Sequence, residues 1–477
     1  MKKSGLFKII MFTLLGMIVA SWFISATYFE NETLSELGMN YAGLFDAFSM
    51  FFKSFLIEYF VQVLLLLLSI AGLYGVLEAT GLYRKLVNKI VDDLKGREFL
   101  FLVLVSLFIA ILTSVFDFGF ALFIFFPLII SVLLLMGYDK VTVGLATFGS
   151  MLIGIIGNTV GYNTSGIVAS VLNVETANNF YFKLALLLVS YVVLLLFLSK
   201  QKRHKVEEKD LKNDDLFMDE VTPKKESLAP IVIVLCVLFV LLVLGCTNWE
   251  DTFKVTFFTD LHDKLFNWEP KLPYLHLTTE GFKVGTEKIA ILNNLFGDLG
   301  AFGKWYYSEM TVLCFLSSLL LGLIYRVNAF EGFGKGIKKM LKPVGVLFMS
   351  YVVLYVAANL MIYPTIADLL LGLTNKLRVL PTALVMAIAS FLHVDVLFVA
   401  NYAAPQIALK ATNTSLVALL TQSIYGVVMF IAPTSIYLAF GLPYLGISYK
   451  EWVKKTWKLV LALLVVVLVV LLIANYL

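Results

Sequence analysis

The feature that most constrains this chain of 477 residues is a series of apolar runs, several of them long enough to cross a membrane. A helix of about 20 apolar residues spans the hydrocarbon core of a bilayer. The runs lie at 9–26, 57–80, 99–137, 141–173, 180–199, 229–247, 310–326, 344–363, 379–410, 413–440 and 455–475. Hydrophobic residues make up 60% of the chain and charged residues 15%, whereas soluble domains carry about 25% charged residues. The sequence therefore predicts an all-α polytopic protein of the cell membrane, surrounded by lipid.

The distribution of charge predicts the orientation of the spans. Lys and Arg cluster in four places, 84–97, 200–225, 326–342 and 450–458. The segment 28–46 is acidic and carries no base. Because basic loops remain in the cytoplasm, the N-terminus is predicted inside, the C-terminus outside, and the run 9–26 a retained anchor. The net charge of +4 is carried at span ends, which argues against a nucleic-acid partner. The amphipathic stretches 83–98 and 330–342 are predicted to be surface helices on the cytoplasmic side.

Two apolar stretches have the wrong length for a single span. Residues 99–137 and 379–410 are long enough to enter the membrane, turn and leave on the same side, which predicts two re-entrant helical hairpins. Two others, 141–173 and 413–440, are interrupted by glycine, proline and small polar residues, which predicts two broken helices.

These segments divide the chain into two similar halves. Residues 1–199 form the first predicted membrane repeat and residues 309–477 the second. Between them lie a charged cytoplasmic loop at 200–228, a connecting span at 229–247 and an extracytoplasmic segment at 248–308. Because one span connects the halves, they start on opposite sides, and the repeat is predicted to be inverted, as in many secondary transporters.

Each predicted hairpin contains one acidic residue. Asp117 stands ten residues before Pro127, and Asp395 stands ten residues before Pro405. A carboxylate within a membrane costs several kcal/mol and by default marks a pathway or binding site, although a position at the hairpin end would leave it simply solvated. The neighbouring His393 is expected to be a hydrogen-bonded structural side chain.

The two predicted helix breaks carry the remaining candidate residues. A break exposes backbone N–H groups that attract anions, and carbonyl and hydroxyl oxygens that coordinate Na⁺. The alternative is that small residues there only let helices approach closely. The candidates for substrate or ion binding are Asn158, Thr159, Asn163, Thr164 and Ser165 in the first break and Pro433, Thr434 and Ser435 in the second.

The motifs favour transport over catalysis. There is no Walker A sequence, no HExxH and no nucleophile–base constellation, and the three cysteines have no paired spacing, so an enzyme is not predicted. The leading hypothesis is a secondary active transporter for a small polar metabolite, an amino acid or an organic anion, coupled to H⁺ or Na⁺ or working by exchange. Asp117 and Asp395 would bind the coupling ion or a substrate amino group. The alternatives are a membrane scaffold or lipid- or envelope-processing protein that uses segment 248–308, and a channel.

Two motifs resemble a known family. The run from GYDKVTVG through GNTVGYNTSGIVAS at 137–170 and the run APTSIYLAFGLPYLGISYKEWVKK at 432–455 resemble YfcC/DcuC-type carriers of the ion transporter superfamily, to which p-aminobenzoyl-glutamate carriers also belong. The resemblance implies the inverted repeat, two re-entrant hairpins, a scaffold that can form a homodimer and a transport part that moves like an elevator. It also implies four-carbon dicarboxylates or amino acids as substrates.

The chain departs from the family pattern at several positions. No proline follows Asn163, Met429 stands where the family has an asparagine, and the family's hairpin acidic pair falls here near Phe120 and Ala121. Asp395 falls near the family's serine-rich hairpin tip. These differences favour an amino acid or another cationic substrate. H⁺ or Na⁺ is expected as coupling ion, with no other cofactor and no metal beyond Na⁺ at the same residues.

Overall fold

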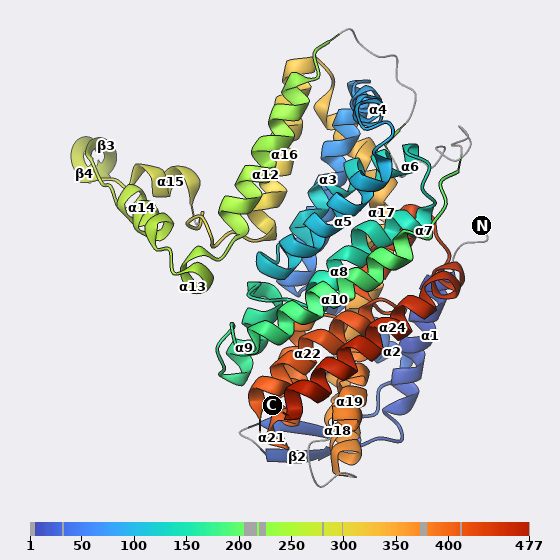
Figure 1. Cartoon of the computed structure of the whole chain (residues 1–477). Coiled ribbons are helices and arrows are strands. Elements are labelled where there is room, and N and C mark those ends of the chain that lie inside the picture. Colours follow the sequence, from blue (N-terminus) through green and yellow to red (C-terminus); the bar gives the residue numbers. More distant parts are fainter. Residues whose placement is uncertain are drawn as a thin grey trace.

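The computed structural model describes residues 5–30, 33–204, 217–218, 226–278, 281–297, 299–372, 379–410 and 413–476 (Figure 1). Within these residues, seven helices are long and apolar enough to cross a membrane. They are α3 (Glu58–Ala79), α5 (Glu98–Val115), α10 (Phe180–Leu198), α12 (Ala229–Cys246), α16 (Tyr307–Tyr325), α17 (Ala329–Leu360) and α24 (Tyr449–Tyr476). The prediction of an all-α polytopic membrane protein is confirmed.

Shorter elements complete the chain. The N-terminal ones are α1 (Gly5–Ala20), β1 (Ala26–Glu30), β2 (Thr33–Gly38), α2 (Leu44–Ser54) and α4 (Tyr83–Asp93). Those between α5 and α10 are η1 (Gly119–Ile124), α6 (Phe126–Leu135), α7 (Lys140–Gly144), η2 (Leu145–Gly149), α8 (Ser150–Ile156), η3 (Tyr162–Gly166) and α9 (Ile167–Leu172). Those between α17 and α24 are α18 (Tyr363–Gly372), α19 (Val379–His393), α20 (Val396–Tyr402), α21 (Ala404–Leu409), α22 (Thr414–Met429) and α23 (Ile436–Leu445).

Helices α3 and α17 pack closely and connect the two halves of the chain. Gly75 on α3 faces Gly336 on α17, and a Cβ atom on either glycine would overlap the backbone of the other helix. Small residues permit this approach in a membrane, where dispersion contacts replace the hydrophobic driving force. The predicted separate surface helix at 330–342 was wrong, because these residues form the first part of α17. Pro343 lies inside α17 and does not end it, since Pro is tolerated in helices of a membrane bundle.

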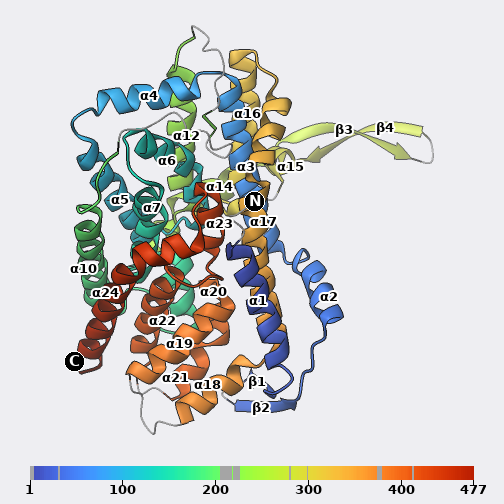
Figure 2. The same ribbon diagram turned by 90° about the vertical axis from the view of Figure 1, so that its right-hand side faces the viewer.

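The first stretch predicted as a hairpin folds as α5, η1 and α6. Its two ends lie beside the same short segment, because Arg203 pairs with Glu98 at 2.8 Å and the His204 N–H donates to the Gly137 carbonyl at 2.8 Å. The chain thus descends through α5 and returns through α6 toward α4, at the upper end of Figure 2.

The second stretch predicted as a hairpin, residues 379–410, folds as α19, α20 and α21 and returns toward α18. Gln406 donates to the Pro364 carbonyl at 2.7 Å, and Lys410 lies 3.5 Å from Asp368. Helices α18 and α21 lie at the lower end of the molecule, opposite to α4 and α6 (Figures 1 and 2). The insertion of either stretch as a re-entrant hairpin, and the inverted symmetry of the halves, stay predictions.

Both stretches predicted as broken helices are interrupted in the structure. The helical run from Lys140 ends at Ile156, and η3 and α9 follow after residues 157–161. Helix α22 ends at Met429, and α23 starts at Ile436.

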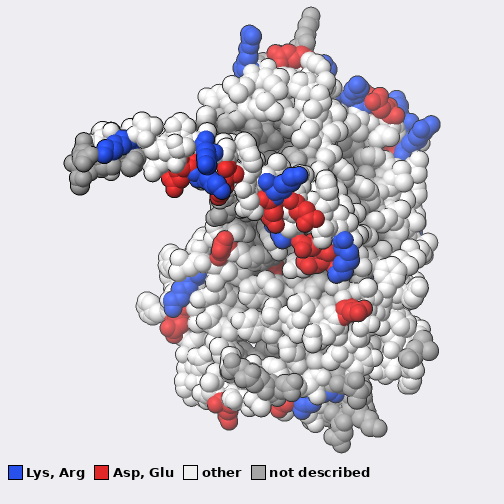
Figure 3. All heavy atoms as spheres, turned by 90° about the vertical axis from the view of Figure 1, so that its left-hand side faces the viewer, with Lys and Arg blue, Asp and Glu red and all other residues white. Residues whose placement is uncertain are grey.

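The segment 248–308 projects from the side of the helical body (Figures 1 and 2). It contains α13 (Trp249–Phe253), α14 (Phe257–Phe266), the antiparallel strands β3 (Lys271–Thr278) and β4 (Gly281–Lys288), and α15 (Ile291–Phe296). Figure 3 shows acidic and basic side chains gathered along this segment, while much of the helical body on that face is uncharged. This contrast agrees with a body that faces lipid and a segment that faces water.

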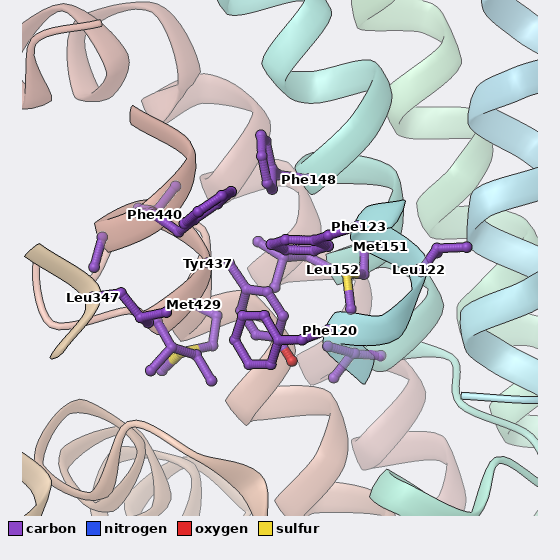
Figure 4. Close-up of a cluster of buried hydrophobic side chains, with 14 of the residues drawn as sticks. Phe120, Leu122, Phe123, Phe148, Met151, Leu152, Leu347, Met429, Tyr437 and Phe440 are labelled. Atoms are coloured by element: carbon purple, nitrogen blue, oxygen red, sulfur yellow. The ribbon is translucent and has the colours of Figure 1, made fainter. Parts of the chain in front are cut away.

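A cluster of aromatic rings joins the first hairpin stretch to the second broken helix (Figure 4). Phe120 of η1 stacks on Tyr437 of α23 with ring centroids 5.7 Å apart. Phe123 of η1 packs edge-to-face on Phe148 of η2 at 5.3 Å and against Phe440 of α23 at the same separation. The cluster fixes η1 against α23. The turn between α5 and η1 therefore lies beside elements of the C-terminal half.

Candidate functional site

The two intramembrane carboxylates, far apart in the sequence, line one small cavity. Its volume is about 230 Å³. It is lined by Tyr59, Asp117, Gly119, Phe120, Tyr162, Asn163, Thr164, Ile167, Tyr306, Tyr307, Asp395, Val396, Leu397, Tyr425 and Tyr437. Among these described lining residues there is no Lys, Arg or His, so the walls supply negative charge and hydroxyl groups but no positive charge.

Asp117 lies in the turn between α5 and η1. Its backbone is left-handed, with φ of 54°, a conformation that Asp and Asn tolerate better than most residues. The carboxylate is buried and its Oδ2 accepts a hydrogen bond from the Asn158 side-chain amide at 3.0 Å. A Cβ atom at Gly161 would lie 2.6 Å from the Asp117 Cβ, so only glycine fits where the first break passes this carboxylate.

Asp395 occupies the equivalent turn between α19 and α20. Its side chain caps α20 by accepting from the Leu397 N–H at 3.0 Å. Its other oxygen accepts from the hydroxyl of Tyr59 on α3 at 2.9 Å. Asp395 is therefore held by the α20 N-terminus and by α3 while it remains at the cavity wall.

The first helix break supplies the next layer of the site. Asn163 and Thr164 line the cavity, and the Asn163 amide donates to the Asp117 carbonyl. Asn158 lies behind them, where its amide donates to Asp117 and its carbonyl lies 2.8 Å from the Ser165 hydroxyl. Thr159 donates to the Ser114 carbonyl at 3.1 Å and lies away from the cavity. Of the five candidates in this break, two contact the cavity and Asn158 positions Asp117.

The second helix break is not part of this cavity. Thr434 donates to the Phe391 carbonyl at 2.7 Å, and Ser435 caps α23 by accepting from the Leu438 N–H at 3.4 Å. Pro433 directly precedes Thr434, in the interruption before α23. Ser435 thus caps the helix whose Tyr437 is a cavity residue, and Thr434 ties the interruption to α19.

Several cavity residues carry no signal in the sequence. Tyr59, Tyr307, Tyr425 and Tyr437 come from four separate helices, and nothing in their spacing predicts that their side chains converge. A different case is Lys183, which is buried on α10 and which stands in an apolar run. An ionisable residue within a membrane span is a functional candidate by default, so the sequence contained that signal.

The expectation for His393 was wrong. Its imidazole is buried and neither ring nitrogen has a hydrogen-bond partner among the described residues. The ring instead stacks on Tyr402 at 5.1 Å and meets the edge of Tyr363 at 5.4 Å. Aromatic packing therefore holds this side chain.

A second cavity adjoins the first on the side of segment 248–308. Its volume is about 290 Å³, and it shares Tyr162, Asn163, Tyr306 and Tyr307 with the inner cavity. The other lining residues are Phe118, Ala121, Cys246, Asn248, Glu250, Asp251, Thr259, Phe302, Gly303, Lys304 and Trp305. The outer cavity thus reaches the charged surface of α13, and the four shared residues form the boundary between the two spaces.

The polytopic helical body, with interrupted helices around a small polar cavity, has the architecture that membrane carriers use. The chain belongs to the C4-dicarboxylate anaerobic carrier family, whose model matches residues 4–476. It is also similar to the solved structure of the YdaH transporter of Alcanivorax borkumensis, at 14% sequence identity, with a TM-score of 0.41 and 98% of this chain and 96% of that chain covered. A search among curated proteins gave no match.

Proposed function

We propose that the protein is a secondary active transporter for a small polar metabolite that carries an ammonium group, such as an amino acid. The observation that carries the proposal is the single cavity between Asp117 and Asp395, whose described lining residues include no base. Two carboxylates that face one small, poorly solvated space attract a positive charge strongly and repel a negative one.

The tyrosines extend this selectivity. Tyrosine faces attract an ammonium group through cation–π interactions, and their hydroxyl groups can donate to the carboxylate of an amino acid. Tyr307 and Tyr437 line the cavity together with Tyr59, which already donates to Asp395. A volume of about 230 Å³ suits a metabolite smaller than a drug-sized ligand.

The outer cavity supports a route to the site. In the predicted orientation, segment 248–308 lies outside the cell, so the adjoining space at Glu250, Asp251 and Lys304 serves as an external vestibule. Tyr162 and Tyr306 lie at the boundary between the two cavities and would form the outer gate. Alternating access then requires the site to close here and open toward the cytoplasmic end.

The coupling ion is proposed to be H⁺, or else the transporter works by exchange. Intramembrane carboxylates form proton relays in many transporters. A proton on Asp117 or Asp395 and a substrate ammonium compete for the same negative charge, which couples their movements.

An organic dianion is the second candidate, because the family is described as carrying C4-dicarboxylates. Such a substrate would enter this cavity only with protons or cations that neutralise Asp117 and Asp395. The two candidates make opposite predictions for those residues, since removal of a carboxylate weakens ammonium binding and strengthens dianion binding.

The test is uptake by the purified protein in liposomes. Labelled amino acids, diamines and four-carbon dicarboxylates are supplied under an imposed H⁺ gradient, a Na⁺ gradient or with the same solute preloaded. Saturable uptake of an amine-bearing solute supports the proposal. Uptake of dicarboxylates alone would establish the second candidate, and no uptake of any of these solutes would contradict both.

A further inference from the structure

Lys183 is a buried lysine whose position neither cavity explains. It lies near the start of α10, its exposure is 3%, and it lines neither cavity. A buried ammonium within a membrane protein is costly and requires partners that replace water.

The Lys183 ammonium is surrounded by two oxygens of the first broken helix and one oxygen of the loop between α9 and α10. Its Nζ lies 2.6 Å from the Thr176 carbonyl, 3.1 Å from the Ser165 hydroxyl and 3.3 Å from the Thr159 carbonyl. The Ser165 hydroxyl also lies 2.6 Å from the Gln422 side-chain oxygen and 2.8 Å from the Asn158 carbonyl, so it donates to one of these and accepts from Lys183. Three acceptors match the three N–H groups of an ammonium.

This donor set is one that a cation site uses. Carbonyl oxygens of unwound backbone coordinate Na⁺ in secondary transporters, and here the Thr159 carbonyl and the Ser165 hydroxyl of the first break are joined by the Thr176 carbonyl of the following loop. The helical run that ends at Ile156 also directs the negative end of its dipole toward the break. We propose that the Lys183 ammonium is a tethered cation that fills the ion position of the first break, so that Na⁺ does not bind there. This inference rests on the proposed function, because it states that the proposed transporter does not bind Na⁺ as a coupling ion at the first break.

The second break supports the same conclusion. There the Phe430 carbonyl accepts from the Trp452 indole N–H at 2.8 Å, and the Ile431 carbonyl accepts from the Tyr449 hydroxyl. Protein donors from α24 thus already occupy these two carbonyls of the break.

Lys183 is also linked to the cavity. Ser165 reaches the Asn158 carbonyl, and the Asn158 amide donates to Asp117. The Lys183 ammonium is therefore connected to Asp117 through Ser165 and Asn158. It stabilises the unwound backbone that positions Asp117 without dissociating during transport.

The test is whether Na⁺ can replace the ammonium once it is removed. The full-length protein is purified as wild type and as Lys183→Ala, which leaves room for an ion, and its apparent melting temperature is measured in NaCl and in choline chloride at equal ionic strength. Wild type is expected to melt at the same temperature in both salts. Lys183→Ala is expected to melt at a lower temperature in choline and to recover by on the order of 2 °C or more in NaCl, because an ion that binds only the folded state stabilises it.

Two variants control for a merely structural lysine. Lys183→Met keeps the length of the side chain and fills the ion position, so Na⁺ should not raise its melting temperature. Lys183→Ala combined with Ser165→Ala removes one oxygen ligand and should weaken the Na⁺ response. The proposal is overturned if Lys183→Ala does not respond to Na⁺, if it does not fold even in NaCl, or if wild type responds equally.

These measurements are separate from the transport assay. If wild type carries no amine-bearing solute, the proposed function fails while the Na⁺ response of Lys183→Ala can still be observed. If wild type does carry one, its uptake should be the same with Na⁺ or choline outside, and uptake by Lys183→Ala should become dependent on Na⁺.

Discussion

Replacement of Asp117 by Asn removes a charge from the cavity with very little change in shape. The left-handed backbone at this position, with φ of 54°, suits Asn as well as Asp. The new side chain can still accept the hydrogen bond that Asn158 donates at 3.0 Å. Folding should therefore be preserved, and the variant should report on charge alone.

The expected loss follows from the strength of charged hydrogen bonds. A hydrogen bond to a charged group contributes about 1.5–3 kcal/mol, and each 1.4 kcal/mol corresponds to a factor of ten. We expect kcat/KM for uptake of an amine-bearing substrate to fall by about 10- to 100-fold in Asp117→Asn. Asp395→Asn should behave in the same way, since Asn is an equally good helix cap for the Leu397 N–H.

The measurement is initial uptake into liposomes over a range of substrate concentrations, with the melting temperature recorded for each variant. The matched control is Asp139→Asn, because Asp139 also caps a helix, accepting from the Thr142 N–H at 2.9 Å, and lies outside both cavities. Its partner Lys455 is partly exposed, so this change should leave uptake near the wild-type rate. Wild-type uptake by Asp117→Asn would refute the site, and faster dicarboxylate uptake would favour the organic-anion alternative.

Three further changes test other parts of the structure. Gly161→Ala should reduce uptake strongly and lower the melting temperature, because its Cβ would lie 2.6 Å from that of Asp117; near-normal uptake would show that the break can move aside. Tyr59→Phe removes the hydroxyl that donates to the second carboxylate at 2.9 Å and should lower kcat/KM in the same uptake assay about tenfold, while an unchanged value would mean that the bond is unimportant. Lys339→Ala removes an ammonium that lies 2.9 Å from both carboxylate oxygens of Glu78, and both side chains are mostly buried. The change should lower the free energy of unfolding in denaturant by about 3–5 kcal/mol, because it leaves a buried carboxylate without this partner. Replacement of both residues by Met should be nearly neutral, and equal losses in the two variants would contradict this reasoning.

The sequence predicted the membrane-spanning character and the places where helices break. An apolar run such as 229–247 satisfies its backbone within its own helix, so it requires no distant partner to be recognised. The breaks at 157–161 and 430–435 were predictable because Gly157, Gly161 and Pro433 interrupt a helix locally. The helix that contains 330–342 was less predictable, because its continuity past Pro343 depends on packing against α3.

The candidate site was predicted only in part. Asp117 and Asp395 could be singled out individually, because a carboxylate in an apolar run is unusual in any context. That both line one cavity depends on how η1 packs against α23 through Phe120 and Tyr437. Contacts of this kind join residues from opposite halves of the chain, and no periodicity in the sequence reports them.

By itself, then, the sequence determined that the chain is embedded in a membrane and where its backbone is interrupted, because both properties depend on the solvent and on neighbouring residues along one helix. Only the tertiary structure decided which interruptions meet, that tyrosines from several helices surround the two carboxylates, and that the Lys183 ammonium contacts oxygens of the first break. Those arrangements depend on the packing of helices distant in sequence, in which a side chain gains its partners only when the whole bundle has assembled.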